Sequence, residues 1–221
     1  MGPIKKFTSD IRKMRHTCKI AGAGFLTTLL KSLTYRLLYN KKIIAHRKVI
    51  IKGVKNIKSN TVLTVGLGNA GFVHDYDITY LNIAGSLRFK GNYNIGRGCR
   101  IDIAEGAEAT FGEGGYTNVN NTFIIKNRLA VGNGCIISWN CQFLDDDYHE
   151  LEYEGRIDKK NEIVLGDHVW VGCGVKLYKG AVISNGCVIA AGSVVRNSID
   201  EENCLVAGNP AKIIKRNVSW R

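Results

Sequence analysis

Branched apolar residues recur every six positions along the last third of this chain. These residues are Leu165, Val171, Leu177, Ile183, Ile189 and Val195. The compact residues that follow the first five of them by four positions are Val169, Val175, Ala181, Cys187 and Ser193. Helices repeat at about 3.6 residues and strands at about 2, so a period of six indicates a chain that turns a corner after each flat face. Three such faces form one coil of a parallel β-helix, whose core exists only when neighbouring coils stack.

The same pattern occurs further upstream, where an apolar residue, a corner containing Gly or Asn and a cysteine follow one another. The matching segments are IGRGC at 95–99, VGNGC at 131–135 and ISNGC at 183–187. Glycine and asparagine tolerate the positive φ that corners require. A Gly-rich β-sandwich is the alternative, but its strands recur at roughly 8–12 residues and do not sustain a period of six. The pattern therefore predicts an all-β fold, a parallel β-helix.

Five short motifs lie in the C-terminal half of the chain. They are ISWNC at 137–141, DDDYH at 145–149, VWVG at 169–172, AAGSVV at 190–195 and GNPAK at 208–212. The region 131–216 that contains them resembles the hexapeptide-repeat acetyltransferases, particularly the branch that O-acetylates sugars and bacterial surface polysaccharides. The resemblance implies a left-handed parallel β-helix, assembly as a homotrimer, and acetyl-CoA bound in grooves between subunits.

Charge and pattern together suggest three parts of the chain. We expect a basic, partly helical segment over 1–47, the β-helix over 48–206 with an inserted loop at about 144–162, and a short C-terminal arm over 207–221. Residues 1–60 hold fifteen Lys or Arg and one acidic residue, whereas the rest of the chain holds sixteen basic and eighteen acidic residues. The net charge of +12 is thus a property of the N-terminal segment.

The N-terminal segment also carries leucines at helical spacing. These are Leu26, Leu29, Leu30, Leu33, Leu37 and Leu38. The apolar run is too short for a spanning helix, which needs roughly 20 apolar residues, and no signal-peptide cleavage site follows it. We expect the leucines to pack on the end of the β-helix or on a partner subunit. An anionic membrane surface bound through residues 1–48 stays open as an alternative, whereas no motif accompanies the charge to indicate nucleic-acid binding.

The seven cysteines favour neither disulfides nor a metal site. Cys99, Cys135, Cys141 and Cys187 occupy the compact position of the repeat, where cysteine serves as a small hydrophobe. Their number is odd and no CxxC pair occurs. We therefore predict reduced thiols, no metal, and a cytoplasmic location, with a peripheral place on the inner face of the cytoplasmic membrane left open.

The repeat stops after Phe143 and resumes at Leu165, and the intervening segment contains the run DDDYH. Such an insertion projects from a solenoid and often forms its binding face. Neighbouring carboxylates such as Asp147 can orient an imidazole, and the resemblance implies that His149 is the catalytic base. Asn140, one residue before the inward-facing Cys141, is a candidate for steadying the base or the acceptor. A surface-loop histidine and a corner asparagine are the alternatives. His168, at another corner, is expected to be solvent-exposed without a catalytic role.

The resemblance also implies where acetyl-CoA, the acyl donor, would bind. The corresponding residues are Trp170, Gly172, Cys173, Ala191, Arg196, Lys212 and Lys215. Small residues let the backbone approach the amides of the pantetheine arm, and basic residues meet the phosphates. For the outward-facing Trp170 the alternative is subunit packing, and for Lys212 and Lys215 it is a solvated tail.

We therefore predict an acetyl-CoA-dependent O-acetyltransferase that acts directly on a sugar hydroxyl, with no acyl-enzyme. The acceptor would belong to a bacterial surface polysaccharide or its lipid-linked precursor. The loop 145–162 holds eight carboxylates against three basic residues, which slightly favours a neutral or lipid-linked sugar over a polyanion. N-acetylation of an amino-sugar nucleotide and a membrane-tethered structural solenoid stay open. A zinc-dependent β-helical carbonic anhydrase is disfavoured because the histidines lack metal-ligand spacing.

Overall fold

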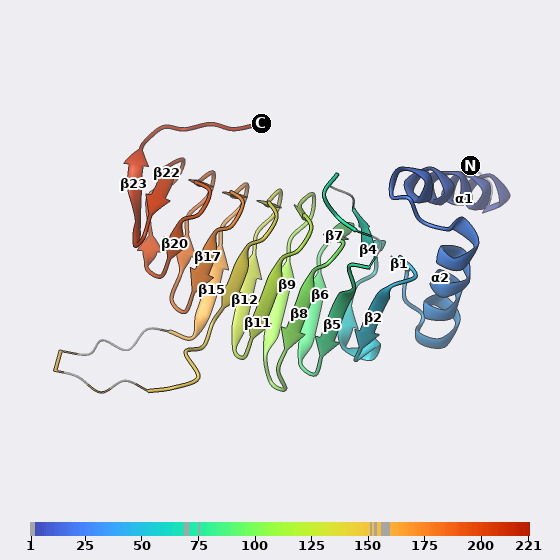
Figure 1. Ribbon diagram of the computed structural model, residues 1–221, viewed down its shortest axis with the longest axis horizontal. Coiled ribbons are helices and arrows are strands. Elements are labelled where there is room, and N and C mark those ends of the chain that lie inside the picture. The colour runs from blue at the N-terminus through green and yellow to red at the C-terminus, as the bar shows by residue number, and fades with distance from the viewer. Residues whose placement is uncertain (1–2, 69–70, 75, 151, 153, 156–159) are drawn as a thin grey trace.

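The computed structural model describes residues 3–68, 71–74, 76–150, 152, 154–155 and 160–221. Two helices, α1 (Pro3–Ile20) and α2 (Phe25–Tyr39), precede a series of short strands and one short 3₁₀ helix, Val54–Asn56. The strands wind into a left-handed parallel β-helix with the helices at its N-terminal end (Figure 1). The predicted fold class is confirmed.

Each strand from β1 to β19 pairs with the strand three places later in the chain, so the strands form three sheets. Sheet A contains β1 (Ile43–Ala45), β4 (Leu63–Gly68), β7 (Tyr93–Gly96), β10 (Tyr116–Thr117), β13 (Ile136–Ile137), β16 (Trp170–Val171), β19 (Val188–Ile189), β22 (Leu205–Gly208) and β23 (Ala211–Lys215). Sheet B contains β2 (Val49–Lys52), β5 (Thr79–Ile83), β8 (Arg100–Ile103), β11 (Thr122–Ile125), β14 (Gln142–Leu144), β17 (Lys176–Tyr178) and β20 (Val194–Val195). Sheet C contains β3 (Ile57–Lys58), β6 (Ser86–Phe89), β9 (Glu108–Phe111), β12 (Arg128–Val131), β15 (Glu162–Leu165), β18 (Val182–Ile183) and β21 (Ser198–Ile199).

The six-residue period corresponds to one strand and one corner. All six branched apolar residues of the C-terminal repeat are buried, with at most 2% of each side chain exposed. Successive coils keep one register, as in the pairing of Val171 with Ile189. The coils are stacked so closely at the corners that a Cβ added to Gly186, where φ is +69°, would lie 2.1 Å from Asn203 Oδ1. Glycine adopts the positive φ of such a corner without strain, and asparagine does so at the next coil, where Asn203 has φ at +53°.

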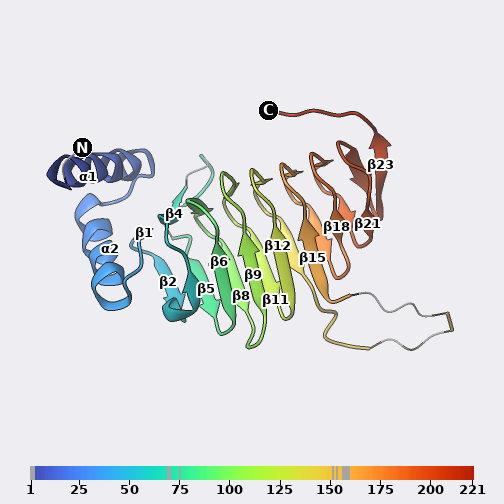
Figure 2. The same ribbon diagram turned by 180° about the vertical axis from the view of Figure 1, so that it is seen from behind.

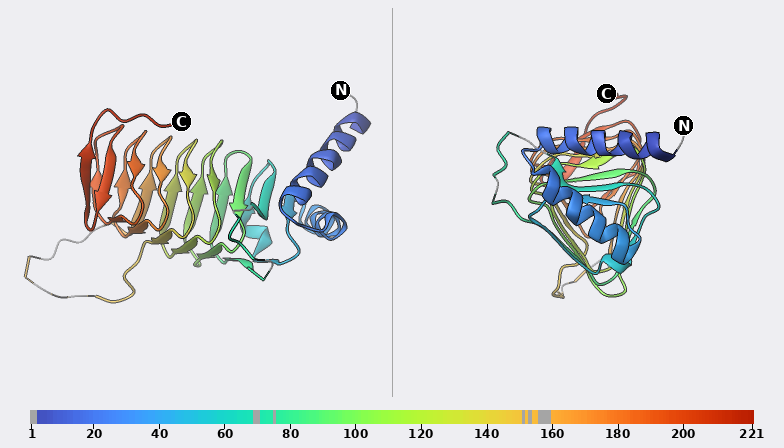
Figure 3. Two further views of the ribbon diagram at one scale, coloured as in Figure 1. Left: turned by 45° about the horizontal axis from the view of Figure 1, so that its top comes forward. Right: turned by 90° about the vertical axis from the view of Figure 1, so that its right-hand side faces the viewer.

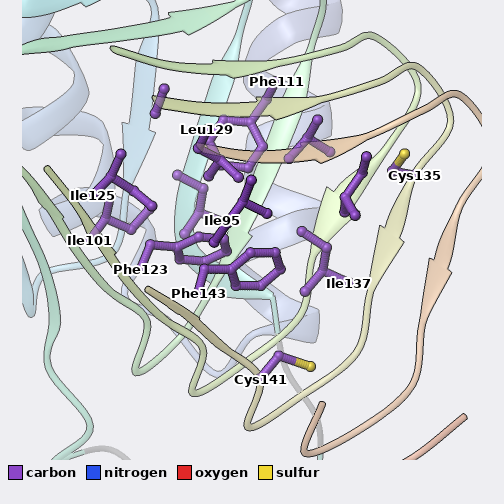
Figure 4. Packing of buried hydrophobic residues seen from close by; sticks show 14 of the residues in the cluster. Ile95, Ile101, Phe111, Phe123, Ile125, Leu129, Cys135, Ile137, Cys141 and Phe143 are labelled. Carbon is purple, nitrogen blue, oxygen red and sulfur yellow. The ribbon is translucent and has the colours of Figure 1, made fainter. Parts of the chain in front are cut away.

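Aromatic rings fill the middle of the β-helix (Figure 4). The rings of Phe123 and Phe143 stack with centroids 4.4 Å apart, and Phe111 meets Phe123 edge-on at 5.8 Å. The cysteines at the compact positions of the repeat are buried, as predicted, and their thiols are free. Burial raises the pKa of Cys99 to about 12 and that of Cys135 to about 11, so these thiols stay neutral near pH 7.

Helix α2 crosses the N-terminal end of the β-helix beside β1, and α1 lies next to it (Figure 3). Two cationic side chains form hydrogen bonds between the helical segment and the coils. The buried Arg97 donates from Nη2 to the carbonyl of Ala21 at 2.7 Å, and Lys31 donates from Nζ to the carbonyl of Arg47 at 3.0 Å. Burial lowers the pKa of Lys31.

Five of the six leucines of α2 are exposed, so the expected packing on the end of the β-helix is wrong for them, whereas packing on a partner subunit stays a prediction. Thr28 and Tyr35 are the buried residues of this helix. The exposed fractions are 65% for Leu26, 57% for Leu30, 43% for Leu33, 79% for Leu37 and 71% for Leu38, whereas Leu29 is partly buried. Helical spacing identifies an apolar stripe, but it does not say which side of the helix meets the body. Within the described part of the chain, no helix is long and apolar enough to cross a membrane.

The chain leaves the coils in two places near the C-terminal end. After β14, residues 145–150 lead away from the body, and the chain returns at β15 (Figure 1). After β22, the chain reverses into the antiparallel strand β23, and its last residues run back along the coils (Figure 2). Four of the ten candidate site residues lie in these two excursions, namely Asp147 and His149 in the first and Lys212 and Lys215 in the second.

Candidate active site

The three aspartates that open the inserted loop differ in their surroundings. Asp145 is fully buried. Its Oδ1 accepts the backbone N–H of Lys126 at 2.8 Å, and its Oδ2 accepts those of Asn127 at 2.8 Å and Arg128 at 2.7 Å. This carboxylate therefore fixes the point at which the loop leaves the coil.

Asp146 shapes the next turn of the loop. Its Oδ1 accepts the backbone N–H of Tyr148 at 2.7 Å, and this hydrogen bond is the main cause that lowers the pKa of Asp146. The backbone of Tyr148 has φ at +61°, a left-handed conformation that non-glycine residues adopt only with local support. The ammonium of Lys126 lies 4.2 Å from the centre of the Tyr148 ring, a cation–π contact that provides part of that support.

His149 follows this braced turn and is exposed. Within the described part of the chain, no hydrogen bond or ion pair reaches its imidazole. Asp147 makes its ion pair with Lys179, at 3.7 Å, rather than with His149. The role of Asp147 as the partner of the histidine thus stays a prediction, and Lys179 is a further charged group at the base of the loop.

Asn140 lies at a different corner from the loop. It has φ at +58°, its side chain is exposed, and its backbone N–H donates to the carbonyl of Val119 at 3.3 Å. Strand β14 separates this corner, between sheets A and B, from the corner between sheets B and C where the loop begins. Five extended residues span about 16 Å, so one chain does not bring Asn140 to the base of the His149 loop.

Three of the candidates for donor binding lie at corners between the same two sheets as Asn140. Gly172, Cys173 and Ala191 follow Asn140 in the column of stacked corners between sheets A and B. The backbone N–H of Gly192 donates to the carbonyl of Cys173 at 2.9 Å, and a Cβ on Gly172 would lie 2.7 Å from the backbone N of Ala191. Small residues are therefore required between these coils.

Three basic candidates are spread over different elements. Arg196 is exposed and follows β20, at the corner between sheets B and C that also carries the loop. Lys212 and Lys215 are exposed on β23, where Lys212 pairs with Ala207. Arg196 therefore lies in the same column of corners as the His149 loop, between sheets B and C, whereas Cys173 lies in the column between sheets A and B.

Trp170 lies on β16, on the outer face of sheet A, and the residue is 40% exposed. Its Nε1–H donates to the hydroxyl of Ser138 at 3.2 Å. The C-terminal arm adds Trp220, whose ring centroid is 6.0 Å from that of Trp170. Trp220 also stacks on His168, with the ring centroids 3.9 Å apart and the planes 5° from parallel, and donates from Nε1 to the His168 carbonyl at 3.1 Å. His168 is thus part of an aromatic group that includes both tryptophans.

Comparison with known proteins identifies the family of this chain. Residues 162–197 match the family described as bacterial transferase hexapeptide (six repeats). The chain is 36% identical over 220 residues to an uncharacterized 24.8 kDa protein in the cps region of Klebsiella pneumoniae, with 99% of each chain covered. It is 29% identical over 148 residues to the putative lipopolysaccharide biosynthesis O-acetyl transferase WbbJ of Escherichia coli K12, covering 62% of this chain and 75% of that protein. The chain belongs to the hexapeptide-repeat acetyltransferases.

A solved structure supports the fold of this acetyltransferase. The polysialic acid O-acetyltransferase OatWY aligns with a TM-score of 0.50 and 17% identity, over 78% of this chain and 86% of that one. An identity this low supports the shared architecture and nothing about the acceptor. Among the described residues of this acetyltransferase, no group of three or more His, Cys, Asp and Glu is arranged to hold a metal ion.

Sequence reasoning missed four residues that shape the candidate site of this acetyltransferase. They are Lys126, Ser138, Lys179 and Trp220. Lys126 and Lys179 lie one coil before and one coil after the loop, so only the stacking of corners reveals them. Trp220 is fifty residues from Trp170 in sequence, and the reversal at β23 brings them together. A tryptophan near the end of a polar tail was the one available signal.

Proposed function

We propose that this acetyltransferase transfers an acetyl group from acetyl-CoA to a sugar hydroxyl, with His149 as the general base. The observation that carries the proposal is the accessible imidazole of His149 on a turn braced by Asp145 and Asp146. The resemblance to sugar O-acetyltransferases and the name of the relative WbbJ support a surface polysaccharide, or its lipid-linked precursor, as the acceptor class.

In this mechanism the imidazole removes the proton of the sugar hydroxyl while the oxygen attacks the thioester carbonyl carbon. A C–O bond forms as the carbonyl π electrons move to oxygen. When the carbonyl re-forms, the C–S bond breaks and CoA leaves as a thiol, taking the proton back from the imidazolium. The products are an acetyl ester and CoA.

Direct transfer, without an acyl-enzyme, is supported by the raised pKa values of three buried thiols. A cysteine that carried the acetyl group would have to be an accessible thiolate. Burial instead raises the pKa of Cys141 to about 12, and Cys99 and Cys135 are shifted in the same direction. We therefore assign none of these three residues a covalent role.

For the donor, we propose that the pantetheine arm lies along the corners at Gly172, Cys173 and Ala191, with Trp170 beside it. Backbone groups at these small residues can hydrogen-bond the amides of the arm. The exposed cations Lys212 and Lys215 would meet the CoA phosphates. Arg196 lies at the loop corner, so we propose that it contacts phosphate only from a neighbouring subunit.

We further propose that the working form is a homotrimer with sites between subunits. Within one chain the base and Asn140 lie at corners on opposite ends of β14. The same separation applies to the base and Cys173. A second subunit that brings its corner between sheets A and B against the loop of the first would complete the site.

The test is His149→Ala, measured in acetyl transfer to sugars and in acetyl-CoA binding by calorimetry. A general base acts in the transition state, so kcat should fall by about 10²–10⁴ while the donor still binds. His16→Ala is the matched control, because this exposed histidine lies on α1 and should keep wild-type kcat. A wild-type kcat in His149→Ala would show that the general base is not His149. Transfer to amino sugars alone would replace O-acetylation by N-acetylation.

A further inference from the structure

Helix α2 turns its apolar side away from the protein. An α-helix advances about 100° per residue, so Leu26, Leu30, Leu33 and Leu37 fall within about 60° of one another. The centre of this leucine stripe lies about 180° from Thr28 and Tyr35, the buried residues of the helix. The stripe consequently points away from β1 and the coils.

The buried side of α2 is the more polar one. Thr28 is completely buried, and its hydroxyl finds no hydrogen-bond partner among the described residues. Lys31 is partly buried on the same side and donates to the carbonyl of Arg47. Full burial of a leucine is worth about 1.5–3 kcal/mol, so packing on the body alone would favour the opposite rotation of the helix. An exposed leucine stripe in this orientation indicates another apolar partner.

Basic side chains gather beside the start of α2, the helix that carries the leucine stripe. A pocket of about 450 Å³ next to the start of α2 is lined by Arg12, Arg15, His16 and Lys19, with Phe25 also in its lining. All four of these polar side chains are exposed. The sequence from residue 11 to residue 60 contains no acidic residue. The partner therefore combines an apolar layer with negative charge.

We propose that α1 and α2 dock this acetyltransferase on an anionic membrane surface. The leucine stripe enters the boundary between headgroups and acyl chains, and the pocket cations contact lipid phosphates. A second copy of the chain fits less well, because it would bring two strongly basic segments together without carboxylates to pair them. The helices do not span the bilayer.

The attachment of these helices suits this role. The hydrogen bond from the buried Arg97 to Ala21 holds the turn between α1 and α2 on the coils. In Figure 1, α2 lies at the N-terminal end of the β-helix, whereas the loop that carries His149 leaves near the C-terminal end. Docking through α2 therefore leaves the candidate active site accessible, and acceptor chemistry can be measured separately from binding.

The test is vesicle flotation of the full chain at physiological salt. The vesicles contain either equimolar phosphatidylglycerol and phosphatidylcholine or phosphatidylcholine alone, and we expect binding to the anionic vesicles. Arg12→Ala with Arg15→Ala and Lys19→Ala should weaken it about 100-fold, since each cation near an anionic surface contributes about fivefold. Leu30→Gln with Leu33→Gln and Leu37→Gln should weaken it at least about tenfold.

The matched control removes three exposed cations from the coils, Arg88, Lys90 and Arg100, and should bind like wild type. Circular dichroism verifies that each variant is folded. Equal binding to both kinds of vesicle, an equal loss in the control, or wild-type binding by the glutamine variant would each overturn the proposal. So would a change in oligomeric state of the glutamine variant without vesicles, since the stripe would then be an interface between copies. None of these outcomes bears on acetyl transfer, which is measured separately.

Discussion

The buried carboxylate of Asp145 offers the sharpest test of how the candidate catalytic loop is positioned. Asp145→Ala removes the acceptor of three backbone N–H groups, those of Lys126, Asn127 and Arg128. A hydrogen bond contributes about 1 kcal/mol net, so the loss of these three part-buried hydrogen bonds should cost about 3 kcal/mol. In a domain of this size each kcal/mol lowers Tm by about 2–4 °C, and the variant should therefore unfold about 6–12 °C earlier.

Asp145→Ala should also lower activity, although Asp145 itself contacts neither substrate in the proposed mechanism. Asp145 fixes the start of the loop, so its loss releases the turn that presents His149 four residues later. We expect kcat to fall at least about tenfold while KM for acetyl-CoA stays the same, because only a transition-state interaction is lost. Thermal unfolding and steady-state kinetics at saturating donor measure the two effects, and assays well below the variant's Tm separate them.

Asp147→Ala is the matched control for stability. The Asp147 side chain is largely exposed, and its pair with Lys179 is of the exposed kind that contributes about 0.2–1 kcal/mol. Its Tm should stay within about 4 °C of wild type. If Asp145→Ala instead keeps both the wild-type Tm and the wild-type kcat, the hydrogen bonds of Asp145 do not hold the loop. The claim that Asp145 positions the loop is then wrong.

Three further predictions concern the donor and the assembly. Lys212→Ala with Lys215→Ala should raise KM for acetyl-CoA with little change in kcat, since phosphate contacts persist from ground state to transition state; a pure kcat loss would contradict that assignment. Trp220→Ala should also raise this KM while Tm changes little, because the arm lies outside the coils; an unchanged KM would limit Trp220 to packing. Mixing inactive His149→Ala and Asn140→Ala chains should restore activity through mixed trimers, and no recovery after subunit exchange would contradict a shared site.

The β-helix could be predicted because its repeat is local. Each face must send one side chain inward, so residues such as Val171 and Ile189 show the period directly in the sequence. The orientation of α2 could not be predicted in the same way. Its stripe at Leu30 and Leu37 is visible, but the body it meets is set by distant contacts, among them those of Arg97.

The candidate site could be predicted by residue type but not by arrangement. In sequence, Asp145, Asp146 and Asp147 are three equivalent neighbours of a histidine. In the structure the first is buried against backbone donors, the second caps the turn, and the third pairs with Lys179. Such differences depend on the adjacent coils, whose corner residues are about twenty to thirty positions away in sequence.

Stacked corners explain how one fold can carry a specific site without compromising its core. Most side chains inside the coils are apolar and tightly packed, and buried polar ones such as Thr117 and Asn121 hydrogen-bond to other groups of the core, so they are not available to act on substrate. Corners repeat at one place on every coil, and an insertion at one of them leaves the hydrogen bonds of the neighbouring strands intact, as the pairing of β12 with β15 across the loop shows. A carboxylate that caps the backbone of the preceding coil, like Asp145, then fixes the start of the insertion. The core can therefore remain constant while the loop alone adapts to an acceptor.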